Sequence, residues 1–406
     1  MTDLKKNIPK LRFPEFSEEW EEKRLGDFLI ESMIKGNKGN EAKKLTVKLW
    51  GKGIVPKNEA HQGSGNTQYY IRKNGQLMYG KLDFLNCAFG IVPPYLDGYE
   101  STIDSPAFDF IKGEPIFILE RIKQKSFYKK YGEKANGSRK AKRINQKDFL
   151  KMKLSFPILK EQQKIGDFFS KLDRQIELEE QKLALLEEQK KGYMQKIFSQ
   201  ELRFKDDNGN DYPEWEEKKL SDLGSYSKSY SFSRDVEGEG KVHHIHYGDI
   251  HSKLPSKISD INLLPTIKES KDFEFLQKGD IIFADASEDY KDLGKAIMVD
   301  IDEDNIIAGL HTHVFRPNLQ IVSEFLMYYT KTLNYFKFIK RQGTGISVLG
   351  ISKKNLSNFV LGLPERREQQ KIGDFFSKLD QQIELQGQKI ESLKQRKKGL
   401  LQKMFV

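Results

Sequence analysis

Cysteine is almost absent from the sequence, because Cys87 is the single thiol among 406 residues. One thiol excludes an internal disulfide framework and any metal site built from several cysteines. The apolar neighbours of Cys87 in the segment FLNCAFG predict a small, buried core residue.

Long apolar runs are missing as well. No stretch of about 18 apolar residues is present, which excludes a membrane-spanning helix. The first ten residues, MTDLKKNIPK, lack the apolar segment of a secretory signal. We therefore expect a cytoplasmic protein with no membrane partner.

Signatures of catalytic domains are also missing. Without a Walker A motif, ATP hydrolysis by this chain is not expected. Residues 92–95, VPPY, resemble the adenine aminomethyltransferase signature, but Val92 occupies the place of its polar acceptor, and no glycine-rich S-adenosylmethionine loop follows a strand. Asp285, Asp289 and Lys291 are the residue types of a Mg²⁺-dependent nuclease, yet their spacing is too short. We predict a non-catalytic chain.

Acidic residues are fewer than basic ones. The 69 Lys and Arg exceed the 59 Asp and Glu, which gives a net charge of +10. Such a surplus concerns binding partners rather than the fold, and polyanions such as nucleic acid become the leading candidates.

The most informative feature that is present is a repeat. EQQKIGDFFSKLD occurs at Glu161–Asp173 and again, unchanged, at Glu368–Asp380. The similarity extends without gaps over residues 161–199 and 368–406. Weaker similarities precede it, between residues 11–28 and 202–223 and between residues 144–157 and 351–364. The chain therefore consists of two copies of one plan.

The repeated segment predicts a long helix in each copy. Its apolar residues recur every three or four positions, as in a heptad seam, and polar residues interrupt the seam at Glu179 and Lys190. The predicted seam residues are Ile165, Phe169, Leu172, Ile176, Leu183 and Leu186 in the first copy, and Ile372, Phe376, Leu379, Ile383, Ile390 and Leu393 in the second.

Each apolar seam needs a cover, and the natural cover is the other copy. Two like units related by a two-fold axis meet through the same surface, so we expect an antiparallel pair. A register that places Glu179 opposite Lys397 and Lys190 opposite Gln386 would match the interruptions. On this plan the helices are spacers, and the two chain termini lie close together.

The segments between the repeats differ from each other. Six apolar stretches predict strands: QLMYGKL, CAFGIVP and PIFILER in the first segment, and DIIFADA, KAIMVDI and HTHVFRP in the second. We therefore expect an α/β (α+β) fold class, with two globular domains separated by two long antiparallel coiled-coil helices in a pseudo-two-fold arrangement. The predicted parts are residues 1–160, 161–199, 200–367 and 368–406.

Positive charge is concentrated within both globular segments. Arg121–Lys153 contains thirteen Lys and Arg against only Glu133 and Asp148, and Lys331–Asn355 contains six and no acid. A solvated helix face normally mixes both signs, whereas basic clusters are the footprint of phosphate binding. DNA is the predicted ligand.

Two unlike domains separated by near-identical helices, each opening with EQQKIGDFF, resemble the specificity subunit of type I restriction-modification enzymes. The resemblance covers essentially the whole chain, including the lead-ins FPILK and LPERR. The segments KLWGKGIVP, HIHYGDI, KGDIIF and RQGTGIS are similar to target recognition domains of that family.

The resemblance implies a function. Each variable domain would read one half of an asymmetric, bipartite target in double-stranded DNA, and the helices would set the spacing and dock two methyltransferase (M) subunits that methylate adenine. Restriction and motor (R) subunits would cleave unmodified DNA. No cofactor is expected on this chain, whereas S-adenosylmethionine, ATP and Mg are expected on the partner subunits.

Candidate DNA contacts are long or polar side chains in glycine-rich turns and basic segments. They are Lys52, Arg72, Lys73, Lys81, Arg139, Lys140 and Arg143 in the first domain, and His246, Tyr247, Asp249, Arg341, Thr344 and Ser347 in the second.

Three alternatives remain at this point. Two H-x-H pairs between residues 243 and 313 could bind a metal, but no carboxylate pattern completes the site and we predict none. An autonomous methyltransferase or nuclease would act on DNA alone. A coiled-coil assembly protein would bind DNA weakly and without salt dependence.

Overall fold

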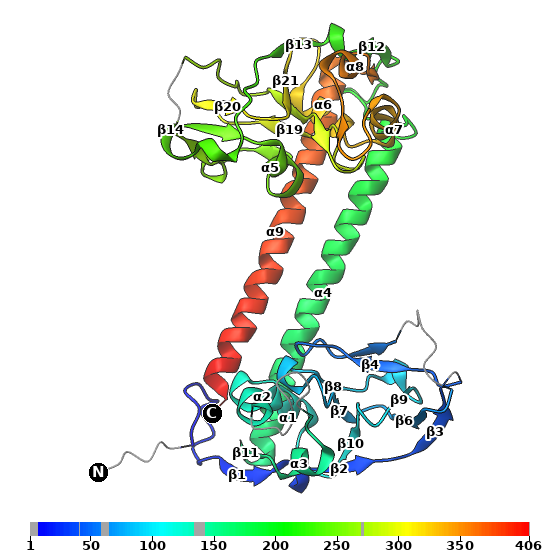
Figure 1. The fold of residues 1–406 in the computed structure, drawn as a ribbon, viewed down its shortest axis with the longest axis vertical. Coiled ribbons are helices and arrows are strands. Elements are labelled where there is room, and N and C mark those ends of the chain that lie inside the picture. The colour runs from blue at the N-terminus through cyan, green and yellow to red at the C-terminus, as the bar shows by residue number, and fades with distance from the viewer. Residues whose placement is uncertain (1–6, 40, 58–64, 134–142, 269–271, 406) are drawn as a thin grey trace. The chain divides into compact units, whose positions relative to one another are not determined.

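The computed structural model of the chain describes residues 7–39, 41–57, 65–133, 143–268 and 272–405. It divides into two compact units. Unit 1 comprises Met1–Glu180 and Gln388–Val406, and unit 2 comprises Gln181–Gly387. Each unit contains one globular domain and part of each of two long helices, α4 (Leu159–Phe198) and α9 (Arg366–Met404) (Figure 1).

Unit 1 combines short antiparallel strands with short helices. Its main sheet has the order β2-β10-β7-β8, beside the smaller sheets β3-β6-β9, β4-β5 and β1-β11. The strands are β1 (Glu21–Arg24), β2 (Leu29–Ser32), β3 (Lys35–Lys38), β4 (Leu45–Val47), β5 (Ile54–Pro56), β6 (Gln68–Ile71), β7 (Leu77–Tyr79), β8 (Phe89–Ile91), β9 (Glu100–Ser101), β10 (Ala107–Phe110) and β11 (Lys153–Phe156). The helices are η1 (Leu25–Asp27), η2 (Phe84–Asn86), η3 (Pro94–Leu96), α1 (Pro115–Ile122), α2 (Lys125–Gly132) and α3 (Gln146–Lys151).

Unit 2 is built in a similar way. Its main sheet has the order β13-β21-β17-β19-β15, beside the sheets β16-β14-β20, β12-β23 and β18-β22. The strands are β12 (Glu216–Lys219), β13 (Gly224–Ser227), β14 (Glu237–Ile245), β15 (Lys257–Ile258), β16 (Thr266–Ile267), β17 (Ile281–Ala284), β18 (Ala286–Ser287), β19 (Ala296–Val299), β20 (Ile306–Ala308), β21 (Thr312–Pro317), β22 (Leu349–Gly350) and β23 (Val360–Leu363). The helices are η4 (Leu220–Asp222), η5 (Arg234–Val236), α5 (Tyr247–Ser252), η6 (Ile261–Leu263), α6 (Ser323–Tyr329), α7 (Leu333–Gln342) and α8 (Lys353–Ser357).

The two globular domains share one frame although their sequences differ. In each, a strand after the lead-in pairs with the strand that precedes two consecutive helices: β2 pairs with β10, and β13 with β21. In each, a short third helix is followed by a strand that returns to the lead-in, β11 to β1 and β23 to β12. The duplication therefore includes the domain frames, and the differences lie in the loops, in the smaller sheets and in the additional edge strand β15 of the main sheet of unit 2.

Five of the six predicted strands are present, and one prediction was wrong. PIFILER forms the helix α1, whose N-cap Glu114 accepts hydrogen bonds from the backbone N–H groups of Ile116 (3.1 Å) and Phe117 (2.5 Å). Pro115 at the first helical position favours the same conformation. A capped start with Pro thus outweighed the apolar, β-branched composition of the segment.

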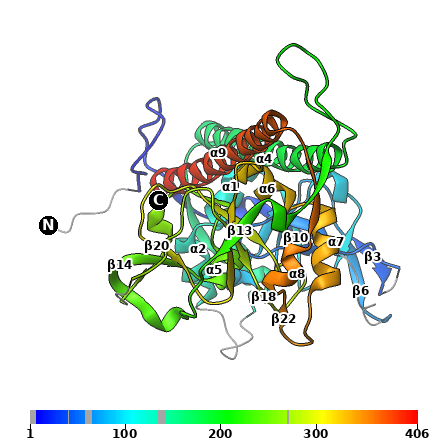
Figure 2. The same ribbon diagram turned by 90° about the horizontal axis from the view of Figure 1, so that it is seen from above.

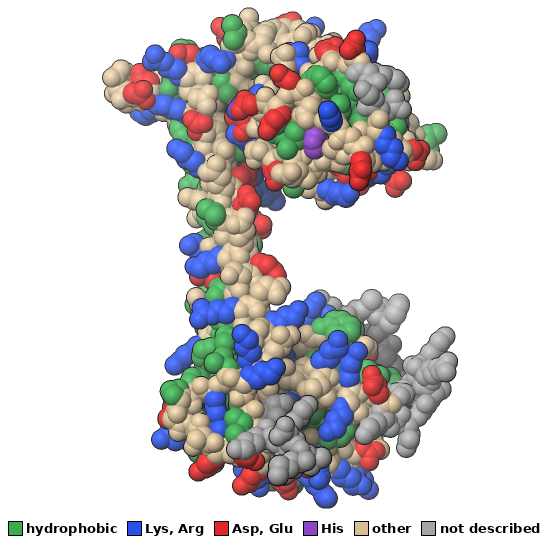
Figure 3. All heavy atoms as spheres, turned by 90° about the vertical axis from the view of Figure 1, so that its left-hand side faces the viewer, with side chains coloured by type: hydrophobic (Ala, Val, Ile, Leu, Met, Phe, Trp, Pro, Cys, Tyr) green, Lys and Arg blue, Asp and Glu red, His purple; other side chains and the backbone are tan. Residues whose placement is uncertain are grey.

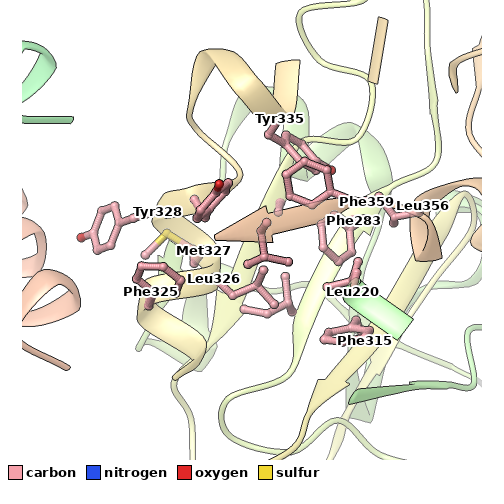
Figure 4. Close-up of a cluster of buried hydrophobic side chains, with 14 of the residues drawn as sticks. Leu220, Phe283, Phe315, Phe325, Leu326, Met327, Tyr328, Tyr335, Leu356 and Phe359 are labelled. Carbon is pink, nitrogen blue, oxygen red and sulfur yellow. The ribbon is translucent and has the colours of Figure 1, made fainter. Parts of the chain in front are cut away.

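Aromatic side chains fill both cores. In unit 1, Trp20 packs edge-on against Phe117 and Phe405, and Phe405 stacks on Phe169 of α4. The core of unit 2 contains Phe283 and Phe315 from its main sheet and Phe325 and Tyr328 from α6 (Figure 4). Each core thus includes residues of the long helices, which anchors those helices in the domains.

The predicted seam residues are all buried or half-buried. In unit 1 these are Ile165, Phe169, Leu172, Ile176, Ile390 and Leu393; in unit 2 they are Leu183, Leu186, Ile372, Phe376, Leu379 and Ile383. Within each unit the segments of α4 and α9 run antiparallel (Figure 1). The burial follows from the heptad spacing, which places these side chains along one stripe of each helix.

The predicted register was wrong. In unit 1, Lys397 Nζ lies 2.6 Å from Asp173 Oδ1, and Lys389 Nζ lies 2.5 Å from Glu179 Oε1. In unit 2, Lys190 pairs with Asp380. These two residues are the repeat equivalents of Lys397 and Asp173, so the same contact is made in both units. The long lysine stem crosses the apolar stripe and carries the ammonium to a carboxylate beside it. The two lysines that interrupt the seams therefore pair with flanking aspartates, and Glu179 pairs with the flanking Lys389 rather than with Lys397.

The first residue of the repeated segment EQQKIGDFFSKLD joins each long helix to its domain. Arg12 makes a bidentate pair with the fully buried Glu161, with both N–O distances 2.7 Å. Arg203 pairs with the equivalent Glu368 at 3.2 and 2.7 Å. These ion pairs fix the lead-in of each domain on its helix.

The next residue of the repeated segment is a buried glutamine, which accepts a hydrogen bond from the backbone of the domain. Gln162 accepts from the Glu114 N–H at 3.2 Å, and Gln369 accepts from the Val322 N–H at 2.8 Å. These contacts explain why glutamate and then glutamine open the repeated segment in both copies: they attach each long helix to its domain.

The C-terminal end of the chain meets the N-terminal lead-in within unit 1. The Leu11 N–H donates to the Lys403 carbonyl at 2.9 Å, and in unit 2 the Leu202 N–H donates to the Lys196 carbonyl at 3.0 Å. One contact is made across the ends of the chain and the other along the continuous chain, at equivalent positions of the repeat. The first and last residues themselves lie outside the described part.

Candidate nucleic-acid interface

The described part of the basic segment of the first domain includes the helices α2 and α3. Phe127 and Phe149 turn inward to the core. Lys125, Lys129 and Lys130 are exposed. Helix amphipathicity therefore separates the aromatic residues from the cations, and leaves the cations available to a polyanion. On the face drawn in Figure 3, Lys and Arg side chains occur over both domains and along the helices.

Arg72 was a wrong prediction as a DNA contact. It is 0% exposed and donates from Nε to Ser101 Oγ at 2.8 Å and from Nη1 to the Ser32 carbonyl at 3.1 Å. Burial lowers the pKa of this guanidinium to about 10. Its role is to join β2 to the turn after β9, where a buried cation satisfies several carbonyl groups.

The other first-domain candidates differ in access. Lys52 and Lys73 are exposed, as is Arg143, which lies 3.5 Å from Asp104. Lys81 is only 9% exposed, and burial lowers its pKa. Lys81 is therefore corrected to a largely buried residue. Arg139 and Lys140 fall outside the residues that the structure describes.

Two candidates of the second domain are also corrected. His246 is 7% and Asp249 is 3% exposed, and they belong to the start of α5. His246 Nδ1 accepts from the Gly248 N–H at 3.1 Å, and Asp249 pairs with Arg234 at 2.9 Å. Both side chains hold the helix start in place. Tyr247 is half-buried between them, against the ring of His311 at 5.2 Å.

Arg341, Thr344 and Ser347 are all exposed, near or within one loop. Thr344 and Gly350 exchange backbone hydrogen bonds of 2.9 and 2.7 Å across the loop. Gly345 has a φ of 121°, which excludes a side chain at this position. The loop presents Ile346, which is 100% exposed and which sequence reasoning missed.

A carboxylate between two histidines holds the base of this loop. Asp285 lies 3.1 Å from His311 Nδ1 and 3.4 Å from His313 Nδ1, and its carbonyl accepts from the Ile351 N–H at 2.9 Å. Strand β18 beside Asp285 pairs with β22 of the loop (Figure 2). Burial lowers the pKa of His313, which favours its neutral form. The cluster of Asp285, His311 and His313 therefore holds the loop between Thr344 and Gly350 in place.

The catalytic and metal alternatives gain no support from this geometry. Asp289 accepts from the backbone N–H groups of Lys291 (2.7 Å) and Asp292 (3.0 Å), which makes it a turn residue. Val92 is 0% exposed. Within the described ranges, no group of three or more His, Cys, Asp or Glu is arranged to hold a metal ion. In the same ranges, no helix is long and apolar enough to cross a membrane.

Sequence reasoning also missed the tip of the hairpin β4–β5. Trp50 is 60% exposed, and its φ of 62° lies in the left-handed region. A bulky residue in that conformation costs on the order of 1–3 kcal/mol. Lys48 and Lys52 on either side are exposed. The segment LWGKG contained the signal, since tryptophan is unusual in a turn that also contains two glycines and a lysine.

The hairpin tip is held firmly against the domain. The Trp50 N–H donates to the Asn86 carbonyl at 2.7 Å, and the Gly51 N–H donates to the Cys87 carbonyl at 2.8 Å. Below the tip, Leu45, Val47 and Ile54 are buried. The exposed indole is therefore presented by a fixed backbone.

Comparisons with known proteins agree with this architecture. Residues 112–188 and 212–395 match the family model described as type I restriction modification DNA specificity domain. The chain is 31% identical over 199 residues to the type I restriction enzyme HindI specificity subunit of Haemophilus influenzae, over 48% of this chain and 41% of that protein. It is 24% identical over 301 residues to the MjaVIII specificity subunit of Methanocaldococcus jannaschii, over 71% of this chain and 68% of that protein.

The fold is shared with a solved structure. The S subunit of a type-I restriction-modification system from M. genitalium superposes with a TM-score of 0.59 at 16% identity, over 98% of this chain and 99% of that one. The match to the Haemophilus influenzae relative spans less than half of that protein's length. The family match over more than half of the sequence, together with the shared fold, establishes the family: the chain belongs to the type I restriction modification DNA specificity domain family.

Proposed function

We propose that the chain is the DNA sequence-specificity subunit of a type I restriction-modification complex. Each globular domain reads one half of an asymmetric, bipartite target in double-stranded DNA. The observation that carries the proposal is one shared domain frame with unlike exposed loops, each frame anchored to a copy of the same helix by Glu161 or Glu368. Two copies of a reader with different loops imply two different half-sites.

The helices set the spacing of the half-sites and dock two methyltransferase subunits. An identical partner that binds twice needs the same surface twice, and the repeated helix is the part of the chain that supplies it. The partners methylate an adenine in each half-site, which they flip out of the duplex. Restriction subunits join the same complex and cleave unmodified DNA.

The chain itself contributes recognition and assembly in the cytoplasm, without catalysis. S-adenosylmethionine, ATP and Mg belong to the partner subunits. The turn role of Asp289 and the buried Val92 support this division, because neither residue is free to do the chemistry that the sequence motifs suggested.

The test is co-purification of the chain with the methyltransferase that its own genome encodes beside it, followed by genome-wide mapping of methylated adenines. We expect a split motif with two unlike halves and a fixed gap. Methylation or cleavage of DNA by the purified chain alone would overturn the proposal in favour of an autonomous enzyme.

A second measurement separates DNA reading from a purely structural helical assembly. Binding of the chain to duplex DNA is measured over a range of salt concentrations. A reader that neutralises phosphates loses affinity steeply as salt rises, whereas a protein that is indifferent to DNA binds weakly and without a slope.

A further inference from the structure

We propose that Trp50 is a base-stacking residue of the first domain: its indole inserts against the face of a base at an opened step of the half-site. The inference rests on the proposed function and adds to it a residue that acts by stacking. It starts from two features that are unfavourable for the isolated protein and coincide on one side chain, namely the left-handed backbone and the 60% exposure.

Within the described part of the chain, the indole N–H of Trp50 has no hydrogen-bond partner. Among the described residues, no aromatic ring stacks on Trp50 and no cation lies over it. The other two tryptophans are employed: Trp20 is 2% exposed in the core, and Trp215 donates from Nε1 to Glu368 at 3.1 Å. Gly or Asn at position 50 would suit the backbone better. A strained, exposed and rigidly held side chain indicates a ligand rather than a folding role.

The surroundings favour DNA as that ligand. Lys48 and Lys52 are exposed on the same tip. Cations beside an aromatic platform are the combination that holds a phosphate backbone while a base stacks on the ring. Leu49 on the same tip is also exposed, at 38%, so a protein partner is the competing occupant that the test must separate.

Intrinsic fluorescence reports the contact directly, because the chain contains only three tryptophans. The full chain is titrated with a duplex that contains the mapped target and with a scrambled duplex. We expect the target to quench the Trp50 emission, because a stacked base quenches indole. The Trp50→Phe variant should show no such change while it still binds. Trp20 and Trp215 stay in their protein environments and serve as the internal reference.

Affinity supplies the second readout. Trp50→Asn should weaken binding to the target about tenfold, which is the loss of one base–aromatic stack. The salt slope should not change, because stacking releases no counterions. The matched control Lys52→Gln should instead lower the salt slope by about one. Because asparagine tolerates the left-handed backbone, the melting temperature of Trp50→Asn should not fall, and the affinity loss can be assigned to the lost ring.

The outcomes separate the inference from the proposed function. If the wild-type chain does not distinguish target from scrambled duplex, the proposed function fails. If it distinguishes them, but target DNA leaves the emission of Trp50 unchanged and Trp50→Asn binds normally, only the stacking role fails. Quenching by the methyltransferase partner without DNA would assign the tip to protein docking and would likewise overturn the inference.

Discussion

At the scale of single residues, burial decides which charges are available. Arg72 and Lys52 both lie in polar, glycine-containing segments, yet Arg72 is enclosed by carbonyl groups and Lys52 is exposed. Local sequence does not reveal this difference, because the groups that enclose Arg72 come from Ser32, Ser101 and the segment around Ser105. A long side chain that is satisfied by several backbone carbonyls stabilises the domain rather than a complex.

A prediction at the scale of residues concerns Gly166 in the repeated segment EQQKIGDFFSKLD. A Cβ at Gly166 would lie 2.0 Å from Glu114 Oε2, the carboxylate that caps α1. Gly166→Ala should therefore displace the cap and lower the free energy of unfolding by about 1–3 kcal/mol. Gly192 in the same helix has nothing within 4 Å of its Cβ position, so Gly192→Ala should raise it by up to about 1 kcal/mol. Urea denaturation measures both, and equal effects of the two substitutions would contradict the assigned contact.

At the scale of the elements, a buried ion pair between α1 and α9 makes the stability of unit 1 depend on pH. Glu120 of α1 is 3% exposed in its side chain and lies 2.6 Å from Lys123 Nζ and 3.4 Å from Lys397 Nζ of α9. Burial opposes ionisation of this carboxyl, but the two ammonium groups outweigh it and lower the pKa of Glu120. The ionised form is therefore favoured in the folded state.

The sign of the pH dependence follows from that shift. Since the pKa of Glu120 is lower in the fold than its ordinary value of 4.5, its contribution to stability is present above that value and is lost as the pH falls through the lowered pKa. Lys397→Met removes one of the two ammonium groups, so the folded-state pKa of Glu120 should rise toward its ordinary value, and the stability lost on acidification should be smaller than in the wild type. Unfolding is followed by circular dichroism across pH 3–7, roughly the range in which carboxyl groups titrate.

Lys394→Met is the matched control for this prediction. Lys394 lies in the same helix and pairs with Glu180 at 2.6 Å, but both side chains are about half exposed. Exposed pairs contribute little, so this variant should follow the wild-type pH profile. A shift of equal size in both variants would show that loss of any lysine, rather than the buried contact, causes the effect.

At the scale of the whole molecule, the repeat makes the two ends of the chain equivalent to an internal connection. The Leu11–Lys403 and Leu202–Lys196 hydrogen bonds are the same contact, made once across the ends and once along the chain. Joining residue 405 to residue 7 by a short flexible linker and opening the chain after Gln200 should preserve cooperative unfolding and the native circular dichroism spectrum. Opening it instead between Glu180 and Gln181, inside α4, should abolish both.

A second whole-molecule prediction follows from the proposed function. Replacing residues 28–143 by the corresponding domain of another family member should change one half of the methylated motif and leave the other half and the gap unchanged. Each domain has its own core, so the exchange preserves packing in unit 2. Methylome mapping gives the result, and a change in both halves would contradict independent reading by the two domains.

The spacer role gives a third prediction at this scale. Inserting one heptad into both helices adds about 10 Å to each and keeps the apolar stripe in phase. The gap between the half-sites should change by a few base pairs while both half-sites stay the same. An insertion of three residues should instead disrupt the seam and prevent assembly. The motif gap is read from the same methylome data.

Much of the architecture was determined by the sequence itself. The spacing of apolar residues from Ile165 to Leu186, and again from Ile372 to Leu393, predicts the two long helices and their buried stripes. A helix places every third or fourth residue on one face. Composition and charge indicate a polyanion partner. The duplication of the chain also explains why the two domains share a frame, although their own sequences predicted only mixed strands and helices.

Other features were decided only by tertiary structure. The helix register follows from where Lys190 and Lys397 find carboxylates, and the burial of Arg72, His246 and Asp249 depends on residues distant in sequence. The exposure of Trp50 and Ile346 likewise depends on which loops the surrounding elements leave uncovered. Short-range pattern specifies a face of an element, whereas burial and pairing are properties of what packs against that face.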